Sequence, residues 1–577
     1  MKNQPQNITD NESKEGMAGI TDAINNAEDF KDPLEDLVER CKKDPGVVFK
    51  PEVIEELATL KKEDLSKFES LRAELRKAGC SMKELNAAIK EINGDDGHKQ
   101  TQADIIIKCI EGEGIQLFHT EDKEAYVDVD NGERRETYNV HSKEFQNWLR
   151  GRFFKETNSA PTPSSLQIAL GTIEAKAIFE GEKREVFLRI GNLNGRIYID
   201  LGGDDWQAVE IDRESWRIIQ KPPVRFRRPT GIQEIPAPKK GGLINDLKEF
   251  LNLENDEDFV MVVAWLLAGF RGQGPYPVMV LSGEQGAAKT SCAKFLRSLL
   301  DPNKSSSRAL PRNERDLFIA ANNGYVLSYD NVSRLPYWLS DSLCRLSSGG
   351  GFATRQLLTD RDEVLFEATR PIILNGIESI VRRSDLADRA LFFTLKSIPE
   401  ELRCSEIDLW KKFEEKRPYI FGVLLDALVE GLKRIGDVEL QSLPRMADFA
   451  KFGVACEGAL WKEGTFCNAY AYNRDKVVDS IIASDPVASA ILSIMEGKTE
   501  WKGTATDLLK AIEEVVGPRV IKSKNFPKGL SALSGRLTRV ATFLRKKDIE
   551  IERKPEGRAG IRMIYITRKI GENNGKI

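Results

Sequence analysis

The stretch that most constrains this chain is residues 278–290, which read VMVLSGEQGAAKT. Four apolar residues typical of a strand lead into Gly283, a short glycine-containing loop follows, and Lys289 and Thr290 precede a helical pattern over residues 291–300. A strand-to-helix turn leaves backbone N–H groups unpaired at the positive end of a helix, where they can surround phosphates. The sequence therefore predicts a phosphate-binding loop.

The side chains of this loop add their own chemistry. Lys289 supplies a positive charge for the β- and γ-phosphates of a nucleotide, and the Thr290 hydroxyl can ligate Mg²⁺. Ala288 stands where glycine is usual, so a glycine-rich turn without a ligand is the alternative. The candidate nucleotide-binding residues are Gly283, Glu284, Gln285, Gly286, Ala287, Ala288, Lys289, Thr290 and Ser291.

The composition describes an ordinary globular chain with an uneven charge distribution. At 577 residues it is too long for one core, and a prior of about 150 residues per domain suggests several units. The net charge is −4, but residues 501–577 hold 18 Lys plus Arg against 8 Asp plus Glu, so this end carries +10 and the remainder −14. A basic module of this kind is expected of a nucleic-acid partner. A solvated basic surface is the alternative.

Cysteine usage and hydropathy exclude several other classes. The eight cysteines are scattered without a CxxC pair, and only three histidines accompany them, so neither a zinc site nor a disulfide framework is indicated. The first 30 residues are polar and acidic, unlike a secretory signal. The longest apolar run, residues 259–270, is shorter than the ~20 residues that span a bilayer. We therefore expect a cytoplasmic protein with reduced thiols and no membrane contact.

The chain before the loop changes character twice. Residues 1–27 are polar and lack periodicity, so we expect a disordered tail. Residues 28–95 have a helical apolar pattern, and residues 100–236 alternate short strands with helices in an α+β region. That region ends in residues 221–229, KPPVRFRRP, whose prolines favour extended backbone. Its cations could follow a phosphate backbone, but a stiff linker is the favoured interpretation.

A second apolar strand, residues 325–330, ends in Asp330. In a parallel sheet such a carboxylate reaches the same edge as the phosphate loop and can hold Mg²⁺ directly or through water. Asn331 follows, where many ATPases carry the glutamate that activates water, and an amide can orient water but cannot take its proton. The general base is therefore unassigned, with Glu284 and Glu314 as candidates.

Two further polar residues border apolar strands. Asn375 ends the strand over residues 370–375, where an amide could sense the γ-phosphate or position the attacking water; capping a turn is the alternative. Arg389 comes just before the next apolar strand and could stabilise phosphoryl-transfer charge in a neighbouring subunit. For Arg389 the alternative is an ion pair with Asp385 or Asp388.

The carboxyl-terminal part is first helical and then mixed. Residues 401–496 predict a helical lid or collar, and residues 497–570 predict two helices followed by a two-stranded basic wing, the arrangement of a winged helix. Its cations lie where a recognition helix and a wing could meet phosphates and groove edges. A winged helix that docks a protein is the alternative. The candidate DNA-contacting residues here are Arg536, Arg539, Arg545, Lys546, Arg558 and Arg562.

Four segments together resemble a known family. The segments GEQGAAKT at 283–290, LSYDN at 327–331, SGGGFATR at 348–355 and PIILN at 371–375 resemble the A, B, B′ and C motifs of superfamily 3 helicases. More narrowly, they are similar to the poxvirus-type primase-helicase ATPases of phages and integrated mobile elements. The resemblance is strongest over residues 241–395.

The resemblance implies an α/β chain with an AAA+-related, parallel-sheet P-loop core over residues 241–400. It also implies a homo-hexameric ring, hydrolysis of Mg²⁺-ATP between subunits, and movement on single-stranded or forked DNA. The implied residue roles are phosphate and metal binding by Lys289 and Thr290, metal binding by Asp330, a sensor at Asn375, an interface finger at Arg389, and a DNA contact at Arg361.

The leading hypothesis is therefore an ATP-driven, ring-forming DNA helicase or translocase that acts in the replication of a phage or mobile element. An ATP-switched DNA-binding loader or defence ATPase without processive unwinding is the alternative. A DNA-binding regulator with a vestigial nucleotide pocket is a third hypothesis. We recognise no Asp-x-Asp primase centre before residue 240, so the candidate source of primers is a separate primase.

Overall fold

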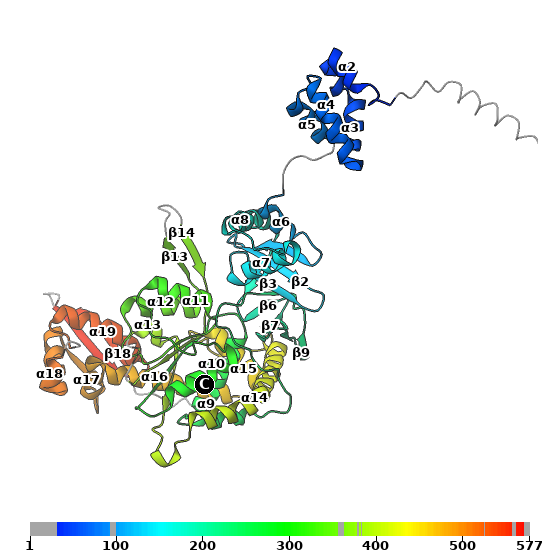
Figure 1. Ribbon diagram of the computed structural model, residues 1–577. Coiled ribbons are helices and arrows are strands. Elements are labelled where there is room, and N and C mark those ends of the chain that lie inside the picture. The colour runs from blue at the N-terminus through cyan, green and yellow to red at the C-terminus, as the bar shows by residue number, and fades with distance from the viewer. Residues whose placement is uncertain are drawn as a thin grey trace, which may run out of the picture. The chain divides into compact units, whose positions relative to one another are not determined.

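The computed structural model describes residues 32–92, 100–355, 363–377, 380–381, 383–523, 526–556 and 561–569 of a mixed α/β protein (Figure 1). The chain divides into two compact units. The first contains the residues up to Ile106 together with Pro161–Leu166, and the second contains Ile107–Ala160 and Gln167–Ile577. The predicted tail, residues 1–27, lies outside the described residues.

The first unit is a small helical bundle with its own core. Asp64 begins one of its helices by accepting hydrogen bonds from the backbone N–H groups of Ser66 and Lys67. The core includes Cys41, Leu57 and Leu85, all nearly inaccessible to solvent. The elements are α2 (Leu37–Lys43), η1 (Pro45–Phe49), α3 (Pro51–Glu63), α4 (Leu65–Lys77) and α5 (Met82–Ile92). Helix α6 (Gln102–Lys108) follows at the boundary of the two units.

The second unit begins with two small sheets. The first sheet has the strand order β3-β2-β1-β4, with α7 and α8 in the same part of the chain, and the second has the antiparallel order β6-β7-β8-β9. The bounds are β1 (Ile115–His119), β2 (Ala125–Asp130), β3 (Arg135–Asn139), α7 (Lys143–Thr157), α8 (Pro163–Phe179) and β4 (Glu182–Lys183). Next come β5 (Val186–Phe187), β6 (Ile190–Leu193), β7 (Arg196–Asp200), β8 (Ala208–Ile211), β9 (Trp216–Ile219) and β10 (Arg225–Phe226).

The proline-rich segment over residues 221–229 fastens these sheets together. Its strand β10 pairs in parallel with β5. All four cations of the segment are used inside the protein: Lys221 pairs with Asp130, Arg225 with Asp128, Arg227 with Asn322, and Arg228 with Asp200. Each of these cations has a partner within the chain, which favours the linker interpretation.

A four-stranded parallel sheet forms the centre of the second unit. Its strand order is β12-β15-β11-β16, and the register aligns Leu281 with Asn375 and Gly283 with Leu395. The carboxyl ends of these strands therefore meet at one edge of the sheet. The bounds are β11 (Val278–Gly283), β12 (Leu327–Tyr329), β15 (Ile372–Asn375) and β16 (Ala390–Leu395).

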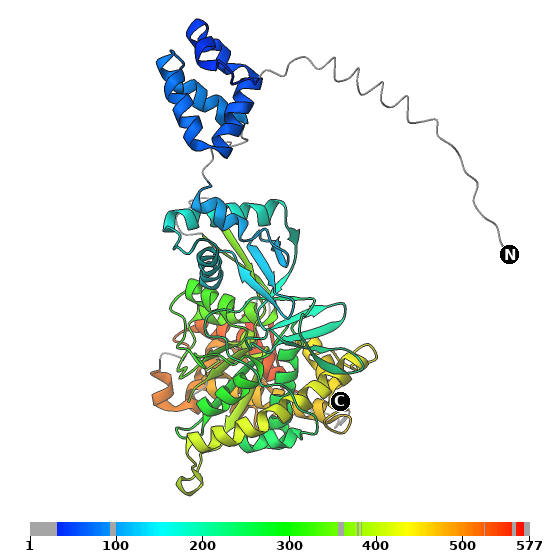
Figure 2. The same ribbon diagram turned by 45° about the vertical axis from the view of Figure 1, so that its right-hand side comes forward.

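Helices cover both faces of this sheet (Figures 1 and 2). Alternate residues of β11 point to opposite faces, so Met279 and Leu281 join one core while Val278 and Val280 join the other. The first core contains α9 (Asp256–Phe270), α10 (Lys289–Leu300), α14 (Glu406–Arg434) and α15 (Ala447–Glu457). The second contains α11 (Glu314–Asn323), α12 (Tyr337–Ser348), α13 (Ser384–Ala387) and the end of α16 (Thr465–Ser484). The 3-10 turns are η2 (Ile244–Phe250) and η3 (Glu400–Leu402).

A hairpin leaves the sheet region between α12 and β15. Its strands, β13 (Gly351–Arg355) and β14 (Glu363–Glu367), are antiparallel. The turn between them contains Arg361 and lies outside the described residues.

The carboxyl-terminal part has three helices and a three-stranded antiparallel sheet of order β17-β19-β18. Helix α17 packs against α18 and α19. Thr504 begins α18 through a capping box with Asp507. Strand β17, which pairs with β19, was not among the predicted elements. The bounds are α17 (Pro486–Ile494), β17 (Glu500–Thr504), α18 (Ala505–Ile521), α19 (Leu530–Arg545), β18 (Ile549–Glu556) and β19 (Ile561–Arg568).

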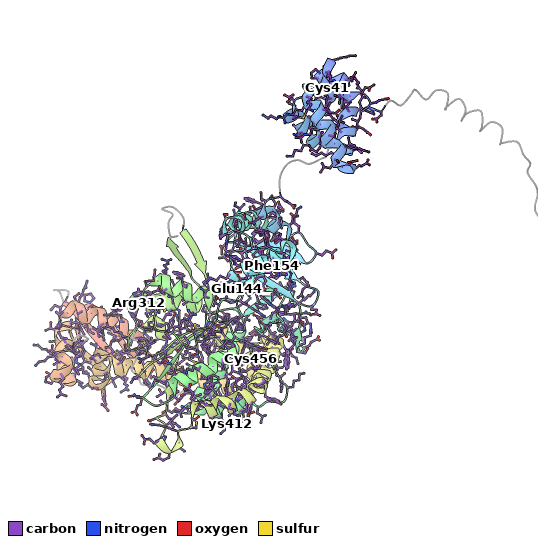
Figure 3. The ribbon with its side chains drawn as sticks, in the orientation of Figure 1. Cys41, Glu144, Phe154, Arg312, Lys412 and Cys456 are labelled. Carbon is purple, nitrogen blue, oxygen red and sulfur yellow. The ribbon has the colours of Figure 1, made fainter. Side chains whose placement is uncertain are left out.

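Among the described helices, no single one is long and apolar enough to cross a membrane. Helices α16 and α17 meet that test only as a pair, bent by 98°. All eight cysteines are free, and Cys41 and Cys456, marked in Figure 3, are among the six that are buried. Burial raises the pKa of the thiol at both positions.

Candidate active site

The loop between β11 and α10 has a backbone that suits glycine at three places. Gly283 has φ 149°, and a Cβ there would lie 2.7 Å from the carbonyl oxygen of Leu395. Gly286 has φ 84°, and Ala288, which stands where glycine is usual, has φ 57°. A residue with a side chain pays about 1–2 kcal/mol for this left-handed conformation. The loop therefore keeps a left-handed backbone at Ala288, at this energetic cost.

The remaining loop residues divide into an exposed tip and a supported base. Glu284, Gln285 and Gly286 are exposed, whereas Ala287 is buried and Ser291 lies half-buried in the first turn of α10. The Ala287 carbonyl accepts a hydrogen bond from Asn252 Nδ2 at 3.3 Å. Asn252 was not predicted, because no local pattern connects it with the loop.

The Lys289 ammonium folds back across the loop. Its Nζ donates to the carbonyl oxygens of Gly283 at 2.9 Å and Glu284 at 2.7 Å. Burial lowers the pKa of Lys289, and the negative charge of Asp330 opposes part of that shift. A positive charge is thus held at the mouth of the loop, within electrostatic reach of the Asp330 carboxylate.

Thr290 and Asp330 meet directly at the edge of the sheet. The Thr290 hydroxyl donates to Asp330 Oδ1 at 3.2 Å, although β15 lies between the strands that precede these two residues. Among the described residues, no group of three or more His, Cys, Asp or Glu side chains could hold a metal ion. A hydroxyl and one carboxylate would leave most positions around Mg²⁺ to phosphate oxygens and water, as is common for this ion.

Asn375, the last residue of β15, places its side-chain amide at the same edge of the sheet. Its Oδ1 accepts a hydrogen bond from the backbone N–H of Asn331 at 2.9 Å, and the same N–H also lies 2.7 Å from Asp330 Oδ1. Asn331 has φ 55°, which asparagine tolerates well, and its side chain is exposed. Asn375 is 1% exposed, and within the described ranges its Nδ2 is buried without a hydrogen-bond partner. A buried orphan donor next to a phosphate loop points to a missing acceptor.

The two candidate bases have different surroundings. Glu284 is exposed at the loop tip. Glu314, at the start of α11, accepts hydrogen bonds from Ser342 and Arg345 of α12, both at 3.3 Å. Glu314 is therefore engaged in a helix-to-helix contact.

Arg389 lies at the opposite end of its strand from the phosphate loop. Ala390 pairs with Val278 at the start of β11, whereas the loop begins where Gly283 pairs with Leu395. The Arg389 guanidinium bonds to Asp385, which also accepts a hydrogen bond from Arg445 at 2.9 Å. The ion pair considered as the alternative is present, and Arg389 does not reach the nucleotide loop of its own chain.

The candidate DNA-contacting residues differ in their exposure to solvent and in their contacts with acidic side chains. Arg539, Arg545 and Arg562 are exposed. Arg536 bonds to Asp485 at 2.6 Å, and Lys546 lies 3.4 Å from Asp388. Arg361 and Arg558 lie outside the described residues.

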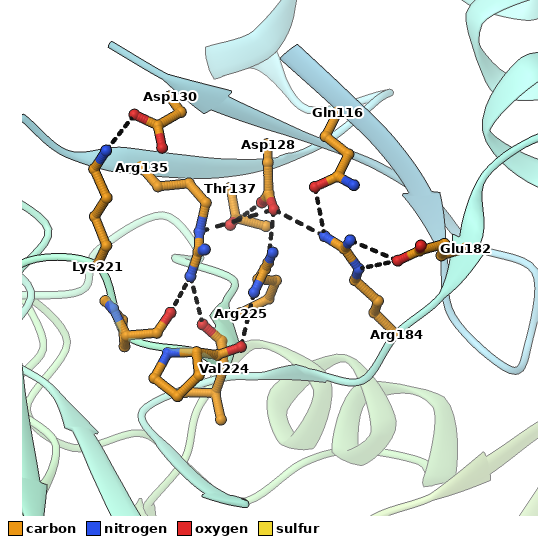
Figure 4. A network of polar contacts seen from close by, with 12 residues as sticks. Gln116, Asp128, Asp130, Arg135, Thr137, Glu182, Arg184, Lys221, Val224 and Arg225 are labelled. Atoms are coloured by element: carbon orange, nitrogen blue, oxygen red, sulfur yellow. Dashed lines mark hydrogen bonds and ion pairs between the residues drawn. The ribbon is translucent and has the colours of Figure 1, made fainter. Parts of the chain in front are cut away.

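A correction concerns the region before residue 240. Asp128 and Asp130 in β2 do have Asp-x-Asp spacing, although no such centre was recognised in the sequence. Figure 4 shows their surroundings: Lys221 bonds Asp130 at 2.7 Å, and Asp128 is only 1% exposed. The contacts of Asp128, at 2.6–3.8 Å, are with Thr137, Arg135, Arg184 and Arg225. These carboxylates are neutralised by cations from the same part of the chain and from the proline-rich segment 221–229, so they form a structural ion-pair network.

Comparison with known proteins adds a family to this geometry. Residues 244–479, which contain the parallel sheet, match the family model of the actinomycete integrative conjugative element replication protein. Residues 487–574 match the model of the RepA C-terminal domain of these elements. Over both regions the chain is similar to a RepA replication protein. The start of the second RepA match coincides with α17, so the RepA C-terminal model includes this helix together with β17 and the elements that follow.

Solved structures give more distant likenesses. The structure titled "SCCmec type IV Cch - active helicase" has a TM-score of 0.40 at 10% identity and covers 78% of this chain and 93% of its own. The NrS-1 C-terminal region has a TM-score of 0.35 at 10% identity, covering 80% and 98%. JCV helicase has a TM-score of 0.20 at 16% identity, covering 32% and 57%. No curated protein matches the chain.

Proposed function

We propose that this protein is a Mg²⁺-dependent ATP hydrolase that acts as a DNA helicase or translocase in the replication of a mobile element. One observation carries the proposal: Lys289, the Thr290–Asp330 pair and Asn375 lie at the same edge of one parallel sheet, around a loop that opens a helix. We interpret the sheet and its helices as an AAA+-like P-loop core. The similarity to RepA supplies the biological setting.

The loop is suited to bind the phosphates of a nucleotide. The first amides of α10 have no acceptor within the helix, and they point toward an incoming anion at its positive end. Lys289 can exchange its two carbonyl partners for phosphate oxygens, because an ammonium bonds a charged oxygen more strongly than a neutral one.

Thr290 and Asp330 are the residues that would hold Mg²⁺. The 3.2 Å hydrogen bond between them shows that a hydroxyl and a carboxylate already converge there. A bound Mg²⁺ would neutralise charge on the β- and γ-phosphate oxygens. Asn331 keeps this arrangement in place through its backbone N–H, which spans Asp330 and Asn375.

Asn375 is placed to recognise the γ-phosphate or the attacking water. Its carbonyl is fixed by Asn331, which leaves the buried amide nitrogen as the free donor. A donor held in position before the reaction stabilises developing charge without reorganisation. Glu284, exposed at the tip of the loop, stays the candidate general base.

The basic carboxyl-terminal part is suited to bind DNA. We interpret α17 to β19 as a winged helix, with α19 as the recognition helix. Arg539 and Arg545 lie on its exposed side, while Leu533, Leu537 and Val540 face the core. Arg562 adds a cation on the second strand of the wing. Phosphate contacts from such residues would position the protein on DNA without reading its sequence.

A role of Arg389 in phosphoryl transfer would require a neighbouring copy of the chain. The residue is at the far end of β16 from its own phosphate loop, so it could stabilise phosphoryl transfer only at the site of a neighbouring copy. We propose a homo-hexamer on the family resemblance, with a separate primase supplying primers.

The decisive test compares the wild type with Lys289→Ala. We expect the variant to lose ATP hydrolysis and unwinding of a forked duplex together, and to keep its DNA affinity, because the basic residues of α19 are untouched. Persistent ATP turnover in the variant would remove the assignment of the loop. Wild-type protein that hydrolyses ATP but leaves the fork paired would favour the ATP-switched loader instead.

A further inference from the structure

We infer that Arg403 is a second phosphate-binding cation of the nucleotide site, supplied by the same chain that carries the loop. This inference rests on the proposed function, because it takes the nucleotide as the ligand. Nothing in the sequence pattern marks Arg403, which lies well beyond the last motif, in the segment between β16 and α14.

The segment that carries Arg403 is fastened to the phosphate loop. Strand β16 ends at Leu395, beside Gly283. Asn252 then joins the two, because its Nδ2 donates both to the carbonyl of Lys396 and to the carbonyl of Ala287 in the loop. The turn η3 follows, and Arg403 ends it with its backbone N–H bonded to the carbonyl of Glu400 at 3.3 Å.

The guanidinium of Arg403 lies beside the tip of the loop. A Cβ built on Gly286 would be 3.5 Å from Arg403 Nη2, closer than any other atom outside the glycine's own neighbourhood. The absence of a side chain at residue 286 therefore leaves the space between the loop tip and this cation open. Lys289 Nζ bonds the carbonyl oxygens of Gly283 and Glu284, so two positive charges lie against residues 283–286 of the loop.

The present partners of Arg403 are easily exchanged. Its Nε donates to the carbonyl of Ile398 at 3.3 Å, and its Nη1 lies 3.6 Å from Glu400 Oε1. The two side chains of this ion pair are 53% and 86% exposed. Exposed pairs contribute little to stability, and within the described ranges Nη2 has no protein hydrogen bond. A triphosphate would offer the fork-shaped guanidinium a better acceptor.

The strand order explains how a cation on the β16 side of the loop would help to bind the phosphate chain. The loop follows β11, which lies between β15 and β16. Asp330 and Asn375 come from the β12 and β15 side, where metal and γ-phosphate would be handled. Arg403 follows β16 on the other side, so the phosphate chain would be held from both sides. Arg389 directly precedes β16, whereas Arg403 follows the turn η3 beyond its carboxyl end.

The test is equilibrium binding of fluorescent mant-ADP and mant-ATP, with Mg²⁺, to the full chain. We expect Arg403→Ala to weaken binding of both by about tenfold or more, the scale of a lost charge-assisted hydrogen bond. Arg403→Lys should recover only part of the loss, because lysine cannot form the two-pronged contact. Lys412→Ala removes an exposed cation from α14 (Figure 3) and should leave binding within about twofold of wild type. Arg403→Ala binding within twofold of wild type would overturn the inference.

A second variant separates phosphate binding from a purely structural role. Glu400→Gln releases the guanidinium from its competing carboxylate, so it should tighten nucleotide binding if Arg403 contacts phosphate. If Arg403 only stabilises the turn after β16, Glu400→Gln should weaken binding as Arg403→Ala does, and that result would refute the inference. Lys289→Ala separates a failure of the inference about Arg403 from a failure of the proposed function. If it abolishes binding while Arg403→Ala does not, only the inference fails; if neither has an effect, the proposed function fails as well.

Discussion

Replacing Asn375 by leucine should separate folding from function at the candidate site. Leucine has the same branching as asparagine but neither donates nor accepts hydrogen bonds. In the nucleotide-free protein, the Asn375 side chain accepts one hydrogen bond, from the backbone N–H of Asn331, and within the described residues its buried Nδ2 has no partner. We therefore expect a variant that folds normally but hydrolyses ATP poorly.

The magnitudes follow from these two groups. Loss of the hydrogen bond to Oδ1 costs about 0.5–1.5 kcal/mol, and the Asn331 N–H keeps Asp330 as an acceptor. Removal of the unpaired donor returns a desolvation cost of about 1–3 kcal/mol. Together these ranges place the net change in the free energy of unfolding between a loss of about 0.5 kcal/mol and a gain of about 2.5 kcal/mol. Hydrolysis should fall by about 10²–10³, because a positioned donor to the reacting phosphate is gone.

Thermal unfolding without nucleotide and steady-state ATP hydrolysis measure the two effects. The matched control is Asn473→Leu, because Asn473 is also fully buried but both of its polar atoms bond the backbone of Phe392 in β16, at 2.8 and 3.2 Å. This control should lose about 2–6 kcal/mol, since it leaves a buried N–H and a buried C=O unpaired at about 1–3 kcal/mol each. A large drop in stability for Asn375→Leu, or a wild-type rate of hydrolysis, would refute the reasoning.

Three other perturbations have defined outcomes. Thr290→Val should lower Mg²⁺-dependent hydrolysis by about tenfold or more while nucleotide affinity without metal stays nearly constant, and an equal loss of affinity without metal would contradict the metal role. The double variant Arg539→Ala/Arg545→Ala should weaken DNA binding and reduce the slope of log affinity against log salt by about two, as measured by fluorescence anisotropy. The control Arg536→Ala should leave this slope unchanged. An unchanged slope in the double variant would exclude these phosphate contacts. Hydrogen bonds from the helix-capping residue hold the pKa of Asp507 below its ordinary value, so its contribution to stability is complete above about pH 4 and is lost as pH falls through the lower, folded pKa. Denaturant unfolding of the Asp507→Asn variant between pH 3 and 6 should show a weaker acid dependence, and an unchanged one would remove this carboxylate from the pH response.

The parallel strands and their polar ends could be predicted because buried parallel strands are continuous apolar runs that end in one polar residue. Their carboxyl ends must share an edge, so Asp330 and Asn375 could be placed near the phosphate loop before any coordinates were known. The same logic placed Arg389 before β16, but not its bond to Asp385, which depends on a turn that the pattern does not specify.

Other features could not be predicted because they depend on contacts between distant segments. Arg403 and Asn252 reach the loop from outside every motif, and only the packing of their backbones brings them there. Three of the four cations of residues 221–229 are bound by aspartates from other strands, and a sequence shows the charges without their partners. Ala288 shows that a residue other than glycine can hold the left-handed backbone of this loop, at a cost of about 1–2 kcal/mol.

The most direct measurement is an electron cryo-microscopy reconstruction of the full chain with Mg²⁺, a non-hydrolysable ATP analogue and forked DNA. We expect density for one triphosphate between the 283–290 loop and Asn375, with the metal at Thr290 and Asp330. An analogue bound elsewhere, or a loop without ligand at saturating nucleotide, would contradict the assignment of this edge of the sheet as an ATP site.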